Sequence, residues 1–286
     1  MTGTPFDRRR TPARPDLAAE HLRGTIEARS YAAPRVMRVA EECVPLRAAP
    51  TPDTMLDTQA IFGERIAIYE DEDNWAWGQL QRDLYVGYLN PNALMRDDAA
   101  PTHRVRVPRT FAYPGLSMKL PIVMALPMGA QLDVVARHGD FAEVRNLGCV
   151  WAAHLARLDE HEPDFVRVAE LFLNVPYLWG GKTALGLDCS GLVQVSLQAA
   201  GVEAPRDTDM QAAELGEPVA VGDDLAGLRR GDLIFWKGHV GIMRDERNLL
   251  HANGHHMLVA SEPLAQARDR ILANAKSPIT AVKRLA

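Results

Sequence analysis

The sequence contains no long hydrophobic run. No stretch of 18 or more apolar residues occurs in its 286 residues, so no transmembrane helix is expected. Arg8, Arg9 and Arg10 are followed by a polar segment with two prolines, rather than by the apolar region of a secretion signal. We therefore expect neither a membrane partner nor export through a signal peptide.

Cysteine and positive charge are scarce as well. The chain has only Cys43, Cys149 and Cys189, and an odd, sparse set fits a reducing compartment better than a disulfide framework. The net charge of −5 argues against nucleic acid as a partner, because phosphate binding needs a concentrated basic surface. A cytoplasmic protein is predicted, and its oligomeric state is left open.

Two segments of the chain repeat each other. Residues 63–89 match residues 129–155 at an offset of 66, with short alternating strands separated by polar turns. Trp75 followed by Tyr85-Val86-Gly87-Tyr88 resembles the Trp-turn-Tyr-x-Gly-Trp pattern of bacterial SH3-type domains. Two small all-β SH3-like barrels are therefore predicted. Their cores are expected to hold Trp75, Trp77 and Trp151.

The regions before and after the repeat have a different character. The first 38 residues hold eight arginines and four acidic residues without a hydrophobic period, which suits a solvated tail or an arm packed on the domains behind it. After residue 160, helical spacing gives way to short strands, an α+β pattern. The predicted parts are a basic arm at 1–38, SH3-like domains at 39–97 and 98–160, and an α+β domain at 161–286.

Cys189 stands where a predicted helix begins, after a glycine-rich segment. The pKa of a thiol at a helix N-terminus or beside an imidazolium falls from ~8.5 toward ~3.5–7.5. The free backbone N–H groups at that end of a helix can also hold an oxyanion. We interpret Cys189 as a nucleophile, and Cys43 and Cys149 as buried structural residues.

Two histidines lie on consecutive predicted strands, where antiparallel pairing can bring them together. His239 is the candidate base for Cys189, and His251 is the candidate group that orients His239. One cysteine and two histidines could instead ligate zinc, but no C-x-x-C or H-x-x-x-H pair frames them. No metal or other cofactor is expected.

These residues belong to six motifs that closely resemble the NlpC/P60 family of cell-wall cysteine peptidases. The motifs stand in the family's order within residues 163–286. They are Val175-Pro176-Tyr177-Leu178-Trp179-Gly180-Gly181, Gly186-Leu187-Asp188-Cys189-Ser190-Gly191-Leu192-Val193, Pro205-Arg206-Asp207-Thr208 with Gln211, Arg230-Gly231-Asp232-Leu233-Ile234-Phe235-Trp236, His239-Val240-Gly241-Ile242 and Leu250-His251-Ala252.

The resemblance implies a papain-like α+β fold with Cys189, His239 and His251 as its triad. It implies hydrolysis of the bond between the γ-carboxyl of D-Glu and a diamino acid, such as meso-diaminopimelate, in murein peptides. Relatives with SH3-type domains before the peptidase are similar to enzymes that cut free peptides beginning with L-Ala-γ-D-Glu. A murein peptide substrate and a role in cell-wall recycling are therefore expected.

The resemblance also implies four substrate-binding residues in the α+β domain. Tyr177 is expected near the oxyanion, and Asp188 and Ser190 are expected to line the pocket. We predict that Asp188 pairs with the free ammonium of L-Ala, because an unpaired buried charge is costly. Thr208 replaces a serine that is common in relatives and keeps the hydroxyl.

Aromatic residues supply two further candidates. Trp179 is a candidate for substrate binding, with packing as the alternative. In the SH3-containing relatives an aromatic of the first SH3-type domain reaches the cleft, and Tyr85 is the candidate here. Its repeat counterpart, Trp151, is then expected to be structural.

Two other functions stay open. A papain-like triad also serves amidases and acyltransferases, which change the bond or the acyl acceptor. The SH3-like domains alone would suit a non-catalytic wall-binding protein. Such a protein would have no use for the intact set of Cys189, His239 and His251.

Overall fold

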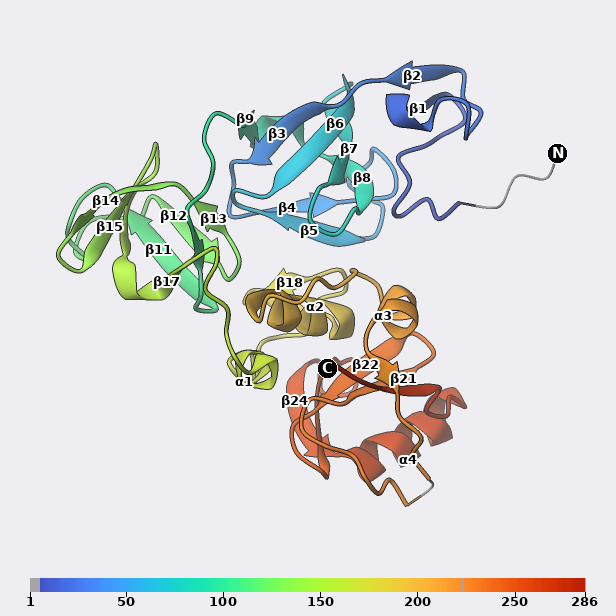
Figure 1. Cartoon of the computed structure of the whole chain (residues 1–286). Coiled ribbons are helices and arrows are strands. Elements are labelled where there is room, and N and C mark those ends of the chain that lie inside the picture. The colour runs from blue at the N-terminus through green and yellow to red at the C-terminus, as the bar shows by residue number, and fades with distance from the viewer. Residues whose placement is uncertain (1–5, 223, 286) are drawn as a thin grey trace. The chain divides into compact units, whose positions relative to one another are not determined.

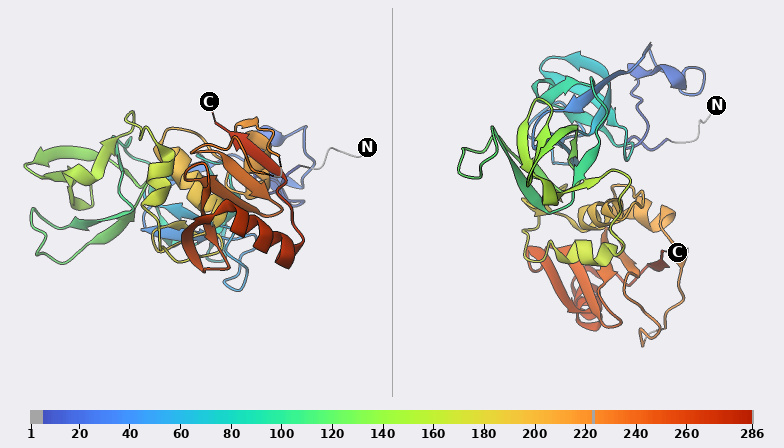
Figure 2. Two further views of the ribbon diagram at one scale, coloured as in Figure 1. Left: turned by 90° about the horizontal axis from the view of Figure 1, so that it is seen from below. Right: turned by 60° about the vertical axis from the view of Figure 1, so that its left-hand side comes forward.

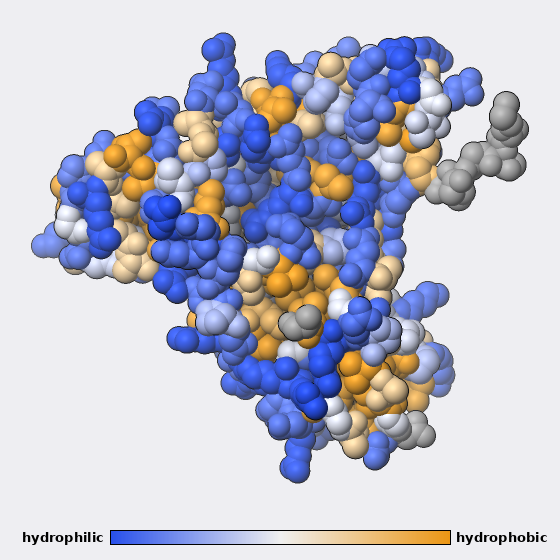
Figure 3. Space-filling model, in the orientation of Figure 1, coloured by the Kyte–Doolittle hydropathy of each residue, from blue (hydrophilic) through white to orange (hydrophobic). Residues whose placement is uncertain are grey.

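A computed structural model describes residues 6–222 and 224–285 (Figure 1). The chain divides into two compact units, Met1–Leu158 and Asp159–Ala286. Among the described residues, no helix combines the length and the apolar character needed to cross a membrane. The face shown in Figure 3 is largely hydrophilic, with hydrophobic residues gathered in small groups.

The first unit holds two groups of strands, each with its own hydrophobic core (Figures 1 and 2). The first group comprises β3 (Arg35–Val39), β4 (Cys43–Leu46), β5 (Thr58–Ile61), β6 (Arg65–Glu72), β7 (Trp75–Leu80), β8 (Val86–Leu89), the 3-10 turn η2 (Pro91–Ala93) and β9 (Leu94–Arg96). Its strands form a sheet in the order β8-β7-β6-β3-β9 and a separate β4-β5 hairpin.

The second group has the same kind of short antiparallel strands. It comprises β10 (His103–Val105), β11 (Arg109–Tyr113), β12 (Met124–Pro127), β13 (Gln131–Leu132), β14 (Val134–His138), β15 (Phe141–Val144), β16 (Gly148–Trp151), the 3-10 turn η3 (Ala152–His154) and β17 (Leu155–Arg157). These strands form two sheets, in the orders β13-β10-β17 and β12-β11-β16-β15-β14.

Backbone pairing shows how far the internal repeat extends. The N–H of Gly63 donates to the carbonyl of Val39, and the N–H of Gly129 donates to that of Val105, both at 2.9 Å. These positions keep the offset of 66 residues. Both glycines have a positive φ, of 79° and 86°, which a residue with a side chain rarely adopts.

The offset is lost after the central hairpin of each group. The turns η2 and η3 are 61 residues apart, because β15 is shorter than β7, the segment 145–147 that joins β15 to β16 is shorter than the segment 81–85 that joins β7 to β8, and η3 follows β16 directly. Trp151 precedes η3 as Asn90 precedes η2. The predicted match of Trp151 with Tyr85 is therefore wrong.

The N-terminal arm packs on the first group of strands. Within it, β1 (Leu17–Ala19) and β2 (Ser30–Ala32) pair in parallel, with the 3-10 turn η1 (Glu20–Leu22) between them. The guanidinium of Arg14 lies 4.4 Å from the ring centre of Trp77 and donates to Glu70 and to the hydroxyl of Tyr88. The described part of the arm is therefore not a solvated tail, and the predicted boundary at residue 38 falls inside β3.

The second unit has the predicted α+β arrangement. It comprises α1 (Phe165–Glu170), β18 (Lys182–Thr183), β19 (Gly186–Leu187), α2 (Cys189–Ala199), α3 (Thr208–Glu214), β20 (Glu217–Pro218), β21 (Leu233–Trp236), β22 (His239–Met243), β23 (Asn248–Asn253), β24 (Leu258–Pro263), α4 (Leu264–Ala275) and β25 (Ala281–Arg284). Its antiparallel sheet has the strand order β20-β25-β21-β22-β23-β24. Every residue of α2 is buried, and this helix contacts β22 and β23.

Candidate active site

Cys189 is the first residue of α2, as the sequence predicted. The preceding Asp188 caps the helix, since its Oδ1 accepts the backbone N–H of Gly191 at 2.6 Å. Gly191 leaves room for this arrangement, because a Cβ atom there would lie 2.2 Å from the carbonyl oxygen of Gly181. The start of α2 is thus pressed against the glycine-rich segment, which fixes the position of Cys189.

A buried ion pair lies beside the start of this helix. Arg206, which is 1% exposed, donates to both carboxylate oxygens of Asp188 at 3.0 and 2.7 Å and to Oγ of Ser190 at 2.8 Å. Asp188 also accepts from the N–H groups of Gly180 and Gly191 and from the Ser190 hydroxyl. The carboxylate therefore has five donors and a balancing cation. The roles of Asp188 and Ser190 in binding substrate stay predictions.

Two predicted site residues lie close to the thiol. Thr208 Oγ1 is 3.7 Å from Sγ of Cys189, and the N–H of Val240 donates to the same sulfur. Tyr177 is half-buried, and its pKa is raised first by burial and then by the neighbouring charges of Cys189 and Asp188. Tyr177 and Thr208 thus share the surroundings of the nucleophile candidate.

The two histidines meet across the sheet. Strands β22 and β23 pair Ile242 with Leu250, and continuing this register places His251 opposite Gly241. His239, two residues before Gly241, therefore shares a face with His251 as its diagonal neighbour. His239 Nε2 lies 2.8 Å from His251 Nδ1. This hydrogen bond uses Nε2 of His239, so Nδ1 is the ring nitrogen of His239 that takes no part in it.

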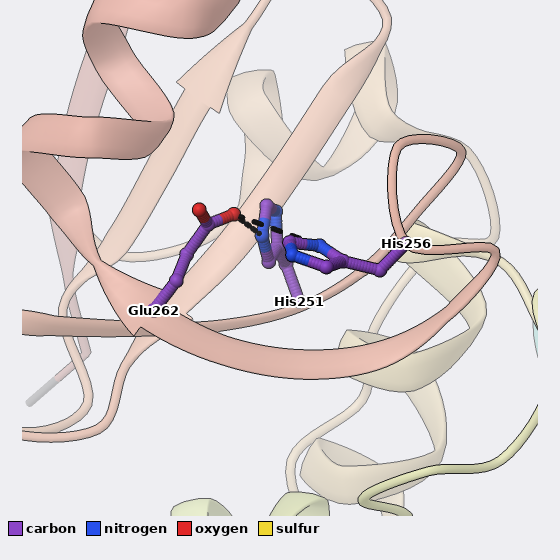
Figure 4. A group of neighbouring side chains, drawn as sticks. All are labelled: His251, His256 and Glu262. Carbon is purple, nitrogen blue, oxygen red and sulfur yellow. Dashed lines mark hydrogen bonds and ion pairs between the residues drawn. The ribbon is translucent and has the colours of Figure 1, made fainter.

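The neighbours of the histidines hold their rings in place. A Cβ on Gly241 would lie 2.7 Å from Cδ1 of Leu249 and 3.1 Å from Cβ of His251, so the glycine leaves room for the side chains of β23. The indole of Trp236 packs against His239, with ring centres 5.5 Å apart. Behind His251, Nε2 lies 2.8 Å from Oε1 of Glu262 (Figure 4). Arg270 in turn donates to both oxygens of Glu262.

Burial sets the protonation of the resting site. It raises the pKa of the Cys189 thiol to about 11, and the charge of Asp188 acts in the same direction. Burial lowers the pKa of His239 to about 3, assisted by His251 and Arg270, and it lowers that of His251 as well. The sequence predicted a lowered thiol pKa from the helix N-terminus, but burial outweighs that effect and the pKa is raised. The resting pair is a thiol and a neutral base.

One cluster has the composition of a metal site. Among the described residues, His251, His256 and Glu262 have candidate ligand atoms within 4.8 Å of one another (Figure 4). Their groups are already hydrogen-bonded, His256 to Asn253 and Glu262 to Arg270. Glu262 is the only carboxylate of this cluster and already pairs with the guanidinium of Arg270, which disfavours the binding of a metal cation beside it. Cys189 and His239 do not belong to the cluster.

The predicted aromatic residues have different surroundings from those expected. Tyr85 is 5% exposed and packs in the core of the first group of strands, where it also lines a pocket with Arg14 and Trp77, and its role in substrate binding stays a prediction. Trp77 is buried, but Trp151 is 38% exposed and packs edge-on against Phe141, which corrects its assignment to a core. Trp179 is 60% exposed, which excludes packing as its explanation.

Glu262 and Arg270 were not predicted from the sequence. Neither lies in a recognised motif, and α4, which carries Arg270, was not predicted. The signal that could have revealed α4 is the helical spacing of Leu264, Ala267 and Ile271 after Pro263.

Comparisons with known proteins identify two domains in the chain. Residues 174–271 match the NlpC/P60 family, and residues 46–94 match the bacterial dipeptidyl-peptidase Sh3 domain. The chain is 27% identical over 227 residues to gamma-D-glutamyl-L-lysine dipeptidyl-peptidase of Bacillus subtilis (strain 168), covering 70% of this chain and 73% of that protein. It is 33% identical over 98 residues to dipeptidyl-peptidase 6 of Lysinibacillus sphaericus, covering 33% of this chain and 34% of that protein.

Solved structures show the same fold. An NlpC/P60 family protein from Bacillus cereus ATCC 10987 superposes with a TM-score of 0.71 at 19% identity, covering 87% of this chain and 99% of that one. An NlpC/P60 endopeptidase from Photobacterium damselae subsp. piscicida superposes with a TM-score of 0.58 at 14% identity, covering 86% and 70%. The chain therefore carries an NlpC/P60 domain, with a bacterial SH3 domain ahead of it.

Proposed function

We propose that Cys189 is the nucleophile of this peptidase, with His239 as its base and His251 as the residue that orients His239. The observation that carries this proposal is the bond of 2.8 Å between the two imidazoles, which occupies Nε2 of His239. The free Nδ1 then serves as the proton acceptor. A base held by a third group beside a nucleophile is the arrangement that covalent catalysis requires.

The proposed reaction begins with the neutral pair of thiol and imidazole. As Sγ of Cys189 attacks the carbonyl carbon of the substrate amide, its proton passes to Nδ1 of His239. We assign the Cys189 backbone N–H and the Tyr177 hydroxyl as the donors to the oxyanion that forms. His239 then returns the proton to the leaving amine, and water, activated by the same nitrogen, hydrolyses the thioester.

We place the scissile bond between the γ-carboxyl of D-Glu and a diamino acid in a short murein peptide. The relatives named gamma-D-glutamyl-L-lysine dipeptidyl-peptidase support this choice, because their name specifies that bond and the release of a dipeptide. Release of an N-terminal dipeptide implies a free L-Ala amine, which suits recycled peptides better than intact wall. Cytoplasmic location and recycling stay predictions, as does an SH3 fold for the strands β10 to β17.

The test is incubation of the purified chain with L-Ala-γ-D-Glu-meso-diaminopimelate, with product masses read over time. We expect L-Ala-γ-D-Glu and free diaminopimelate. A matched reaction with Cys189→Ala should give neither. Transfer of the dipeptide to an added amine in place of water would indicate an acyltransferase, and an intact substrate with the wild-type chain would refute the proposal.

A further inference from the structure

Two residues behind the histidines extend the chain of hydrogen bonds away from the thiol. Glu262 Oε1 lies 2.8 Å from His251 Nε2, and Arg270 donates to Glu262 Oε2 at 2.6 Å. We propose that Glu262 and Arg270 are positioning residues that fix, through His251, the tautomer of His239 whose Nδ1 carries no proton. This inference rests on the proposed roles of Cys189, His239 and His251.

The geometry of the sheet brings these groups together. Strands β23 and β24 pair His251 with Ala260 and Leu249 with Glu262, so His251 and Glu262 are diagonal neighbours on one face. His239, on β22, is the diagonal neighbour of His251 on the other side of β23. Arg270 comes from α4, outside the sheet, and donates to Glu262 at the end of this chain of hydrogen bonds. The side chains of His251, Glu262 and Arg270 are 0%, 10% and 20% exposed, so the line is shielded from water.

The order of donors follows from the end of the line. An ionised carboxylate only accepts, so Nε2 of His251 must carry the proton that lies between it and Glu262. A neutral His251 then has a bare Nδ1, which can only accept from Nε2 of His239. A neutral His239 with its proton on Nε2 has a lone pair on Nδ1. The carboxylate thus determines which nitrogen of His239 can take the thiol proton.

Arg270 keeps the end of the line in its accepting form. Burial alone would raise the pKa of Glu262, but the bonds from Arg270 and His251 outweigh it and hold that pKa well below its usual range. A protonated Glu262 could donate to His251 and reverse every bond in the line. The two opposite charges also cancel, so the pair contributes orientation and tautomer selection rather than net charge.

The first test uses ¹⁵N-histidine-labelled full-length wild-type protein near pH 7. Long-range ¹H–¹⁵N spectra distinguish the two neutral tautomers of each imidazole. We expect the Nε2–H form for both His251 and His239. A signal from the Nδ1–H form of His251 in the wild type would overturn the proposal, whatever the activity of the protein.

The second test is Glu262→Gln, whose amide can donate to His251 as well as accept from it. We expect part of the His251 population to change to the Nδ1–H form. We expect kcat to fall about 10-fold to 100-fold with KM little changed, less than the ~10⁴-fold that a wrong tautomer of a directly bonded base can cost. The matched control is Glu246→Gln, the same substitution at an exposed position of the turn between β22 and β23.

Two further variants separate positioning from folding. Arg270→Lys keeps the charge and should retain more activity than Arg270→Gln, while thermal melts monitor the fold. Unchanged kcat and unchanged tautomers in Glu262→Gln would refute the proposal. If wild-type protein cleaves no murein peptide, the proposed function fails while the tautomer spectra still decide the inference. The rate of Cys189 alkylation by iodoacetamide gives a readout that needs no substrate.

Discussion

Replacing Asp188 by asparagine should cost far more stability than its role as a helix cap alone would suggest. Asparagine keeps an oxygen for the N–H of Gly191, so the cap itself changes little. The substitution removes the negative charge beside Arg206, whose side chain is 1% exposed. A buried cation left without its partner typically costs about 3–5 kcal/mol.

The chain offers a matched control for this prediction. Asp164 caps α1 by accepting from the N–H groups of Val166 and Arg167, and it also pairs with an arginine, Arg230. Here both charged side chains are well exposed, at 42% and 39%. Asp164→Asn should therefore cost no more than about 1 kcal/mol.

Hydrogen exchange of the α2 amides in the full-length variants measures the stability of the unit that holds the helix. Protection should fall about 10²-fold to 4 × 10³-fold in Asp188→Asn and little in Asp164→Asn, since about 1.4 kcal/mol corresponds to a factor of ten. Equal protection in the two variants would refute the reasoning. If Asp188→Asn kept its stability but ceased to distinguish free from N-acetylated L-Ala peptides, the predicted role in binding the ammonium would be favoured instead.

Other predictions concern the histidines and the thiol. Cys189→Ala should lower kcat by about 10⁶-fold with an unchanged melting temperature, and residual activity above a tenth would exclude Cys189 as nucleophile. His239→Ala should be nearly as damaging, whereas His251→Ala should cost about 10²-fold to 10⁴-fold in kcat, and a silent His251→Ala would contradict its orienting role. The low pKa of His239, about 3 against 6.5 in the unfolded chain, predicts full stability above pH 6.5 and a loss of about 2 kcal/mol by pH 5. Urea titrations of wild type and His239→Gln across this range should converge as the pH falls, and parallel curves would contradict a neutral buried His239.

Local patterns in the sequence predicted the parts of the site that local structure determines. A cysteine before a run of helical spacing marks the start of α2, and two histidines on neighbouring strands indicate their pairing. The pKa of the Cys189 thiol could not be predicted in the same way. It depends on burial by segments distant in sequence, and on whether His239 is charged.

The errors have equally specific causes. The offset of 66 residues holds for Gly63 and Gly129, where the two groups of strands pair alike, but a shorter β15 and a shorter connection between β15 and β16 change it before Trp151. A constant offset therefore assigned Trp151 to the wrong partner. Glu262 and Arg270 were missed because no local pattern joins them to His251. Only the diagonal geometry of the sheet and the packing of α4 bring them together.

The diagonal line across β22, β23 and β24 makes the sheet's register a condition for activity. A slip of one residue in β23 would move His251 to the opposite face while leaving the strand intact. A compact, misregistered chain would then have nearly the same circular dichroism spectrum but no base oriented toward the thiol. In refolding experiments, specific activity would therefore count only the chains with the correct register, whereas secondary-structure signals would count both.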